Sequence, residues 1–347
     1  MSPRDTLTSP TLDPIEDISR RGLLVAPLVA AVFAACRDDK SDDTSDSQEP
    51  GAPGFPRTVT HTMGSATIPA QPQRIAAVSD GVSLDHILAL GITPVLYGQT
   101  PGYDGKGELQ PWAREAAAGS LASYQADRLE PDMERFAATA PDLIVAAWVN
   151  EDQYRRLSAI APTIVIKVAD ATAWPEMQRI VGEATGMEQA AEAALAETDA
   201  AIAAAAARLA PYAGRSVTVG YQFQGELYMH GPDTPIARLL VRMGLNVRGA
   251  DGSPDNELTT FSLEQVNRYQ DADILLSPSF FPADQEALES SPLFRTLPAV
   301  QQGRYMPLPR DIAQAGYEES TLSVRWVVFR LADATIEAAE GRGKRLS

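Results

Sequence analysis

Hydrophobic side chains recur at helical spacing along an Ala-rich stretch in the middle of the chain, from Trp174 to Leu209. Leu, Glu, Gln and Arg fill most of its other positions, and these residues lose little side-chain freedom in a helix. Because Gly186 interrupts the stretch, we predict a short helix followed by a long one over residues 188–209, about 33 Å in length. The apolar stripe of the long helix is formed by Ala191, Leu195, Thr198, Ile202 and Leu209.

Short apolar runs alternate with helical patterns on both sides of this stretch. On the N-terminal side, the run 74–78 is followed by an amphipathic pattern that ends at Gly91 and by a second run, 92–98. A strand, a helix and a strand joined by tight connections are typical of a parallel βαβ unit. On the C-terminal side, the runs 216–222 and 272–278 flank another amphipathic helix. The pattern predicts two α/β halves bridged by one helix; the alternative is a surface helix on a single domain.

Composition narrows the possible functions. A length of 347 residues suggests two domains, each long enough to bury a core. The net charge of −17 argues against binding to nucleic acid or to an anionic membrane surface as the main task. The single cysteine excludes an internal disulfide and a thiolate metal cluster. The three histidines, His61, His86 and His230, are too few and too scattered to predict a metal site.

The N-terminal segment has the pattern of an export signal. Arg20 and Arg21 follow a serine and precede an apolar stretch, residues 23–35, that is too short to cross a membrane. After one glycine, the bulky apolar residues Leu23 and Leu24 follow the arginine pair, so the segment resembles a twin-arginine signal. We therefore expect the mature protein to work outside the cytoplasm.

Cys36 follows two small residues at the end of the apolar stretch, an arrangement similar to a bacterial lipobox. Phe33 stands where that motif usually has Leu, Val or Ile. The resemblance implies that the Cys36 thiol carries a lipid, which anchors the protein to the membrane. Residues 37–56 are acidic, rich in Ser and then rich in Pro and Gly, so we expect them to form a solvated tether.

Motifs of the familiar ATPases and hydrolases are absent from the sequence. Residues 102–109 read GYDGKGEL, which lacks both the hydroxyl residue and the preceding strand of a phosphate-binding loop. The sequence also contains no G-x-S-x-G nucleophile elbow and no H-E-x-x-H zinc motif. We therefore predict that the protein is not an enzyme of these kinds.

Four segments, taken in their order and spacing, carry a family resemblance. They are RIAAVSDGVSLDHILALGITPVLYG at 74–98, LEPDMERFAATAPDLIVA at 129–146, GPDTPIARLLVRMGLNV at 231–247 and FSLEQVNRYQDADILLSPS at 261–279. They closely resemble the iron–siderophore substrate-binding proteins, extracytoplasmic receptors of ABC importers that share a structural group with the vitamin B12 and haem receptors. The resemblance implies a ferric siderophore as ligand, an ABC permease and ATPase as partners, a monomer, and no cofactor or nucleic acid.

The same resemblance, which covers about residues 57–340, implies the fold. We expect an α/β protein with two Rossmann-like lobes, each built on a parallel-rich central sheet, joined by one long interlobe backbone helix, as in the class III periplasmic-binding-protein fold. The expected segments are a signal peptide (1–36), a linker (37–56), an N-terminal lobe (57–173), interlobe helices (174–209) and a C-terminal lobe (210–347).

Ligands of open α/β sheets bind outside the carboxyl ends of the strands, so residues that follow strands are the candidates for a cleft. Aromatic rings can stack on flat groups, and Arg and Tyr can donate to the anionic oxygens of a hydroxamate or catecholate. The predicted ligand-binding residues are Asp80, Tyr103, Trp148, Tyr221, Phe280, Phe281 and Arg310. Asp80 is better suited to cap the helix that follows it than to contact a ligand, and Trp112 and Tyr124 lie in a region that could fold over a ligand.

Two acidic residues have a different expected role. Glu134 and Glu264 lie early in a predicted helix of each half, where their charges would favour the helix N-terminus. The resemblance implies that they also project from the tops of the lobes and engage arginines of the permease.

Three other functions stay open at this stage. The same fold could bind cobalamin, haem or a bare metal. The scaffold could carry an enzyme that acts on the siderophore, or it could be a sensor that reports ligand occupancy without transport. The sequence shows no Ser or His with a base partner that would favour the enzyme.

Overall fold

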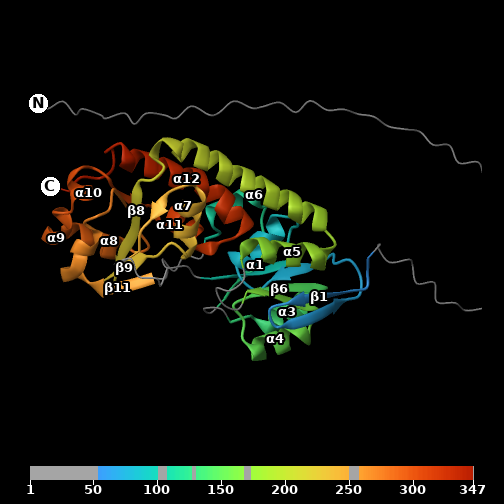
Figure 1. Ribbon diagram of the computed structural model, residues 1–347. Coiled ribbons are helices and arrows are strands. Elements are labelled where there is room, and N and C mark those ends of the chain that lie inside the picture. The colour runs from blue at the N-terminus through green and yellow to red at the C-terminus, as the bar shows by residue number, and fades with distance from the viewer. Residues whose placement is uncertain (1–53, 101–107, 127–129, 168–172, 250–257, 347) are drawn as a thin grey trace, which may run out of the picture. The chain divides into compact units, whose positions relative to one another are not determined.

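Two central β-sheets organise the protein, and one long helix runs past both of them (Figure 1). The computed structural model describes residues 54–100, 108–126, 130–167, 173–249 and 258–346. We call the part around the first sheet the N-terminal lobe and the part around the second the C-terminal lobe. The prediction of two α/β lobes with parallel-rich sheets is confirmed.

The N-terminal sheet has five strands, and every pair of neighbours is parallel. In spatial order they are β5 (Ser123–Gln125), β4 (Leu96–Gln99), β3 (Ile75–Ala77), β6 (Leu143–Ala147) and β7 (Thr163–Lys167). The three central strands and β7 are buried along their whole length, as expected for a parallel sheet covered on both faces. The first strand, helix and strand form the predicted parallel βαβ unit.

Helices and a hairpin complete this lobe. They are the hairpin β1 (Arg57–His61) and β2 (Gly64–Ile68), and the helices α1 (Val82–Leu88), α2 (Pro111–Ala116), α3 (Met133–Thr139) and α4 (Glu151–Ser158). Every residue of α1 is buried, because the helix contacts β6 on one side and helices of both lobes on the other. Helix α4 begins with a capping box in which Asn150 and Gln153 bond each other's backbone N–H.

The C-terminal sheet is mixed. Its spatial order is β11 (Leu258–Ser262), β9 (Glu226–His230), β8 (Ser216–Phe223), β12 (Ile274–Pro278) and β13 (Tyr305–Leu308), with β10 (Asn246–Val247) paired to β8. The pairs of β8 with β12 and of β12 with β13 are parallel, whereas β9 and β11 are antiparallel additions. The carboxyl ends of β8, β12 and β13 therefore lie at one edge of the sheet.

The helices of this lobe are mostly short. They are η1 (Ala210–Tyr212), α7 (Pro235–Arg242), η3 (Leu263–Tyr269), α8 (Pro282–Ser290), α9 (Pro292–Arg295), α10 (Pro298–Gln301), α11 (Arg310–Glu318) and α12 (Thr321–Ala339). The predicted helix after Ser262 is 3₁₀ rather than α, and the Ser262 side chain accepts no capping hydrogen bond from its backbone N–H groups. Non-helical angles at Gln265 interrupt its turn, which prevents regular α-helical bonding.

The helices between the lobes match their prediction. Helix α5 (Trp174–Thr185) ends at Gly186, whose φ of 70° is the left-handed conformation that glycine adopts at little cost. Helix α6 (Glu188–Leu209) follows and buries the predicted apolar stripe. Figure 1 shows α6 passing both sheets, with α12 packed along it.

Three hydrophobic clusters stabilise the fold. One lies wholly within the N-terminal lobe, around Phe136 and Leu157, and a second lies wholly within the C-terminal lobe, around Phe294 and Tyr305. The third and largest cluster contains residues of both lobes together with the buried faces of α6 and α12. The lobes therefore have cores of their own and also share one, which favours small relative movements.

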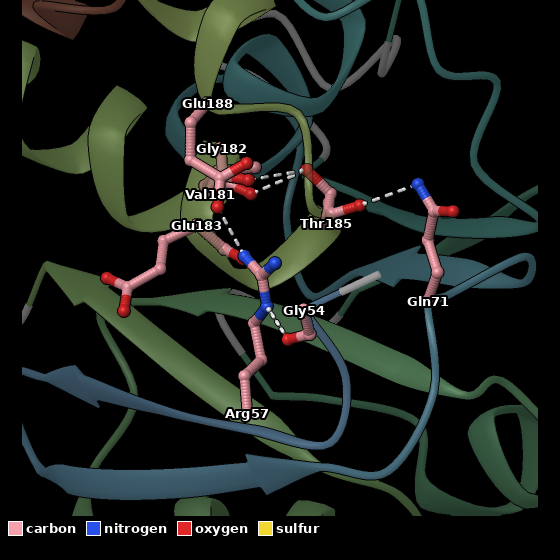
Figure 2. Close-up of polar contacts among 8 residues, drawn as sticks. All are labelled: Gly54, Arg57, Gln71, Val181, Gly182, Glu183, Thr185 and Glu188. Carbon is pink, nitrogen blue, oxygen red and sulfur yellow. Dashed lines mark hydrogen bonds and ion pairs between the residues drawn. The ribbon is translucent and has the colours of Figure 1, made fainter. Parts of the chain in front are cut away.

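The turn between α5 and α6 is held by the first strand (Figure 2). The Arg57 guanidinium donates to the carbonyl of Glu183 at 2.6 Å and forms an ion pair with Glu188, the first residue of α6. Gln71 donates to the carbonyl of Thr185 at 3.3 Å. The Glu183 carbonyl also accepts from the Gly186 N–H at 3.2 Å, so the side chains of Arg57 and Gln71 add to the capping of α5.

Candidate ligand-binding cleft

Most of the predicted ligand-binding residues lie at strand ends, as expected. Asp80 follows β3 and Trp148 follows β6 in the N-terminal lobe. In the C-terminal lobe Tyr221 lies near the end of β8, and Phe280 and Phe281 follow β12. Arg310 follows β13 as the first residue of α11, while Tyr103 and Cys36 fall outside the described residues.

The C-terminal lobe carries a set of aromatic rings that contact one another, which we call the aromatic wall. It comprises Tyr221, Phe223, Tyr228, His230, Phe280, Phe281 and Tyr317. Tyr221 is its centre: its ring stacks on Tyr228 with centroids 5.0 Å apart and meets Phe280 edge-to-face at 5.5 Å. Phe223 stacks on Phe281 at 5.2 Å, so both predicted phenylalanines belong to the wall. Ring pairs at these distances are favourable beyond the area that they bury.

His230 is a structural member of this wall. Its Nδ1 lies 3.0 Å from the Thr234 hydroxyl, and the Tyr317 hydroxyl bonds its Nε2. Burial lowers the pKa of His230 to about 3, so the ring is neutral at physiological pH. Both ring nitrogens of His230 are therefore engaged in hydrogen bonds within the wall.

Trp148 has an unusual backbone and an unusual neighbour. Its φ is 60°, a left-handed conformation that costs a bulky residue free energy. Its N–H donates to the Lys167 carbonyl at 2.7 Å, and the Lys167 ammonium lies 5.0 Å from the centre of the indole. The side chain is 36% exposed, so Trp148 is not an aromatic residue of the hydrophobic core. Trp148 is therefore available to a ligand at the edge of the N-terminal sheet.

Asp80 does not cap α1, contrary to one of its two expected roles. The N-cap position is Gly81, and its conformation gives α1 no side-chain cap. The Asp80 carboxylate instead accepts hydrogen bonds from Thr100, at 2.7 Å from the hydroxyl and 3.2 Å from the backbone N–H. Burial raises the pKa of Asp80 to about 6 despite these bonds. Asp80 thus ties β3 to the end of β4.

Buried carboxyl groups meet where the α11–α12 junction packs on the N-terminal lobe. Asp85 accepts hydrogen bonds from the Ser320 hydroxyl at 2.5 Å and from the Trp112 indole at 2.6 Å. Burial raises the pKa of Asp85 to about 7. The Glu318 carboxylate lies so close to Gly81 that a Cβ there would be 2.6 Å from its Oε2. Burial, and then repulsion by Asp85 and Asp80, raises the pKa of Glu318 to about 8.

An ion-pair chain continues from this junction. Glu319 lies 3.9 Å from the Lys167 ammonium of the N-terminal lobe and 2.5 Å from the Arg238 guanidinium of α7. Nearby, His86 bonds Gln178 of α5 at 2.9 Å, and burial lowers the pKa of His86 to about 4. The His86 ring is therefore neutral and buried inside the fold.

A pocket of about 300 Å³ lies between the lobes. The N-terminal lobe contributes Thr100 and Arg114 to its lining, and α11 contributes Arg310, Asp311 and Gln314. Two guanidinium groups from different lobes can therefore donate to one anionic ligand. Arg310 therefore lies in a pocket that residues of both lobes line, and its contact with a ligand stays a prediction.

Two aromatic residues of the 98–128 region do not cover the cleft. Trp112 is buried between the lobes against Asp85 and Trp326, and Tyr124 is buried on β5, where it donates to the Val78 carbonyl at 3.1 Å. Both are core residues because α2 and β5 pack inward. Within the described residues, no group of three or more His, Cys, Asp or Glu side chains is arranged to hold a metal ion. None of the described helices is both long and apolar enough to span a bilayer.

Glu134 and Glu264 are both exposed and lie in the first turn of a helix, α3 and η3 respectively. A hydrogen bond from Ser262 lowers the pKa of Glu264, so this carboxylate is ionised. One charge on each lobe is thus presented to solvent.

Sequence reasoning missed the residues that link the lobes, which are Lys167, Glu318 and Glu319. A charged residue that ends an otherwise apolar strand, as Lys167 ends TIVIK, was the available signal. The two glutamates gave no comparable signal, because their partners lie in the other half of the sequence.

Two α/β lobes with ligand-accessible side chains at their strand ends define a two-lobe binding protein. The model of the family described as periplasmic binding protein matches residues 106–311. The chain is 27% identical over 285 residues to the ferric enterobactin-binding periplasmic protein FepB of Escherichia coli, covering 77% of this chain and 88% of FepB. It is 24% identical to the Fe(3+)-citrate-binding protein YfmC of Bacillus subtilis, covering 83% of this chain and 88% of YfmC.

Solved structures agree with the fold. A periplasmic solute binding protein from Mycobacterium smegmatis superposes with a TM-score of 0.69 at 25% identity, covering 81% of this chain and 98% of that one. PiaA of Streptococcus pneumoniae, solved with ferrichrome, gives a TM-score of 0.65 at 23% identity, covering 82% and 99% of the two chains. This chain belongs to the periplasmic binding protein family.

Proposed function

We propose that the protein is the extracytoplasmic substrate-binding component of an ABC importer, and that it captures a ferric siderophore between its lobes and delivers it to the permease. The observation that carries this proposal is the combination of an aromatic wall on the C-terminal lobe, the exposed Trp148 on the N-terminal lobe, and the guanidinium groups of Arg114 and Arg310 in the interlobe pocket. Relatives named for ferric enterobactin and Fe(3+)-citrate support the ligand class.

The chemistry of the cleft suits a metal that arrives already chelated. Aromatic rings can pack on the flat organic arms of a chelate, and guanidinium groups can donate to its anionic oxygens. No protein side chain then has to coordinate iron, so the protein needs no cofactor and no catalytic group. The family model and the shared fold support a binding role rather than an enzymatic one.

The test is a titration of tryptophan emission with ferric enterobactin, ferrichrome and ferric dicitrate, with the iron-free chelators as controls. We expect saturable quenching by at least one ferric chelate, because Trp148 is the exposed member of the four tryptophans. A response to cobalamin or haem and to none of the three chelates would contradict the ligand class and leave the fold assignment intact.

We propose further that Cys36 carries a lipid anchor after export by the twin-arginine-type signal, and that the protein acts as a monomer tethered through residues 37–56. Two relatives from Bacillus subtilis, YfiY and YhfQ, are named as lipoproteins, which supports the lipid anchor. Replacing Cys36 by Ser should move the protein from the membrane fraction to the medium or periplasm.

Glu134 and Glu264 are proposed to dock the protein on its permease. Their exposure and their matching positions, each in the first turn of a helix on its own lobe, support this role. Two fixed charges on separate lobes would orient the receptor and report the relative position of the lobes.

A further inference from the structure

A continuous series of contacts leads from the exposed Trp148 of one lobe to a helix of the other. The Lys167 ammonium lies 5.0 Å from the Trp148 ring centre and 3.9 Å from Oε2 of Glu319. The other carboxylate oxygen of Glu319 lies 2.5 Å from the Arg238 guanidinium on α7. Lys167 is the only one of these residues that touches both the candidate ligand contact and the opposite lobe.

The position of Lys167 is costly for a purely structural side chain. It is 3% exposed, and its partner Glu319 is 10% exposed, so both charges are largely removed from water. Burying an ion pair often contributes less to stability than apolar side chains of the same volume would. The neighbouring backbone of Trp148 is also held in a left-handed conformation. Costs of this kind concentrate at functional sites.

We propose that Lys167 is a positioning residue for ligand binding: its ammonium fixes the indole of Trp148 from the buried side and, through Glu319, links ligand contact on that ring to the α11–α12 junction. This inference rests on the proposed function, because it takes Trp148 as a ligand contact. It assigns a role to a residue that need not touch the ligand.

The electrostatic setting of Lys167 explains why a cation is required there. Three carboxyl groups surround the junction, Asp80 and Asp85 from the N-terminal lobe and Glu318 from α11. The charge of Lys167 opposes their repulsion, since it acts to lower the pKa of Glu318. A cation on one face of an indole also withdraws electron density from the other face. The exposed face of Trp148 should therefore favour electron-rich or anionic groups over cationic ones.

The test compares Lys167→Met with the wild type, using ferric dicitrate, ferrichrome and ferric enterobactin as probes. Lys167→Met should raise Kd for the chelate that binds the wild type by about tenfold, because the indole loses its buried support. In a Trp148→Ala background the same substitution should change Kd by less than about twofold. A matched control is Arg155→Met, which removes an exposed cation from an ion pair on α4 and should leave Kd unchanged.

A structural role without positioning would give a different pattern. In that case Lys167→Met would lower the melting temperature and raise Kd equally in both backgrounds, and this additivity would overturn the proposal. Glu319→Gln provides a second route, because it removes the partner on the other lobe while keeping the lysine. Its effect on Kd should be smaller than that of Lys167→Met and should not add to it.

A measurement without ligand separates this inference from the proposed function. The difference in emission between wild type and Trp148→Phe isolates Trp148, since Trp112, Trp174 and Trp326 are buried. Lys167→Met should shift this difference spectrum and increase its quenching by acrylamide. If no chelate binds but the spectrum shifts, the proposed function fails while the positioning of Trp148 stands. An unchanged spectrum and unchanged quenching would overturn the role of Lys167.

Discussion

At the strand ends of the C-terminal lobe, aromatic rings pack on one another, whereas at those of the N-terminal lobe each group is held by hydrogen bonds and charges. Tyr221 is surrounded by rings of its own lobe. Trp148 lies against the Lys167 ammonium, and Asp80 accepts hydrogen bonds from Thr100. The two edges of the cleft therefore offer a ligand different kinds of contact.

The two edges of the cleft also differ in whether their structure depends on the opposite lobe. The aromatic wall is complete within one lobe, so its shape does not change when the lobes move relative to each other. The N-terminal edge includes Lys167, which has its charge partner Glu319 on the opposite lobe. We infer that the wall supplies a fixed surface for the organic part of the ligand, while the charged edge responds to lobe position.

The largest effect is expected where neither edge is involved. Reversing both charges, Glu134→Lys with Glu264→Lys, should abolish uptake because the exposed glutamates are the proposed contacts with permease arginines. The Kd for ferric chelate should stay unchanged. Transport of labelled ferric iron into cells is the measurement, with binding by the purified protein measured alongside.

The control for this reversal is Glu151→Lys with Glu337→Lys, which changes the net charge equally at two other exposed glutamates. If uptake survives in the Glu134 and Glu264 double variant, or is lost equally in the control, the docking assignment is wrong.

An intermediate effect is expected at the centre of the aromatic wall. Tyr221→Ala should raise Kd for the ferric chelate by roughly 10- to 100-fold, because it removes a stacking surface and loosens its neighbours. Tyr221→Phe keeps the ring and should bind within a few-fold of the wild type. Equal loss in both variants would show that the hydroxyl, and not the ring, is what the ligand requires.

The smallest effect concerns the carboxyl groups beneath the charged edge. The folded-state pKa values of Asp85 and Glu318 are raised to about 7 and about 8, so the folded protein holds protons that the unfolded chain releases. Their contribution to stability is complete at acid pH and is lost as pH rises through these values. Below about pH 6.5, His86 and His230 act in the opposite direction, because their lowered pKa values favour the neutral ring.

The free energy of unfolding should therefore rise as the pH falls from about 8.5 to about 6.5. In Glu318→Gln, this rise in the free energy of unfolding should be smaller by on the order of 1 kcal/mol. The value is modest because the Glu318 side chain is only partly buried. Denaturant unfolding at several pH values is the measurement, with Glu197→Gln as an exposed control. A slope that is equally steep in Glu318→Gln would exclude this carboxyl as its source.

The sequence was sufficient for regular elements and for positions defined by strand ends. The bounds of α6 were predicted correctly, because helix propensity, the apolar stripe and the break at Gly186 agree with one another. The positions of Trp148 and Arg310 after strands were predicted correctly, and their roles as ligand contacts stay predictions.

Interactions between segments that are distant in the sequence could not be predicted. Asp80 has the local pattern of a helix cap, but its actual partner, Thr100, lies after the next strand. The Trp112 indole donates to Asp85, and the Lys167 ammonium pairs with Glu319. Only the three-dimensional fold brings these partners together. The periodicity of a sequence predicts which face of a helix or strand is buried. It does not predict which residues pack against that face.

The last long helix has a consequence for how the protein can be divided. Helix α12 belongs to the C-terminal lobe by sequence, yet it packs on α1, α2 and α5 of the earlier part of the chain as well as along α6. A fragment that ended before α12 would expose to water the surfaces of α1, α2 and α5 that this helix covers. The first lobe should therefore reach its native packing only after the end of the chain has been made, and isolated lobes should be poor substitutes for the whole protein.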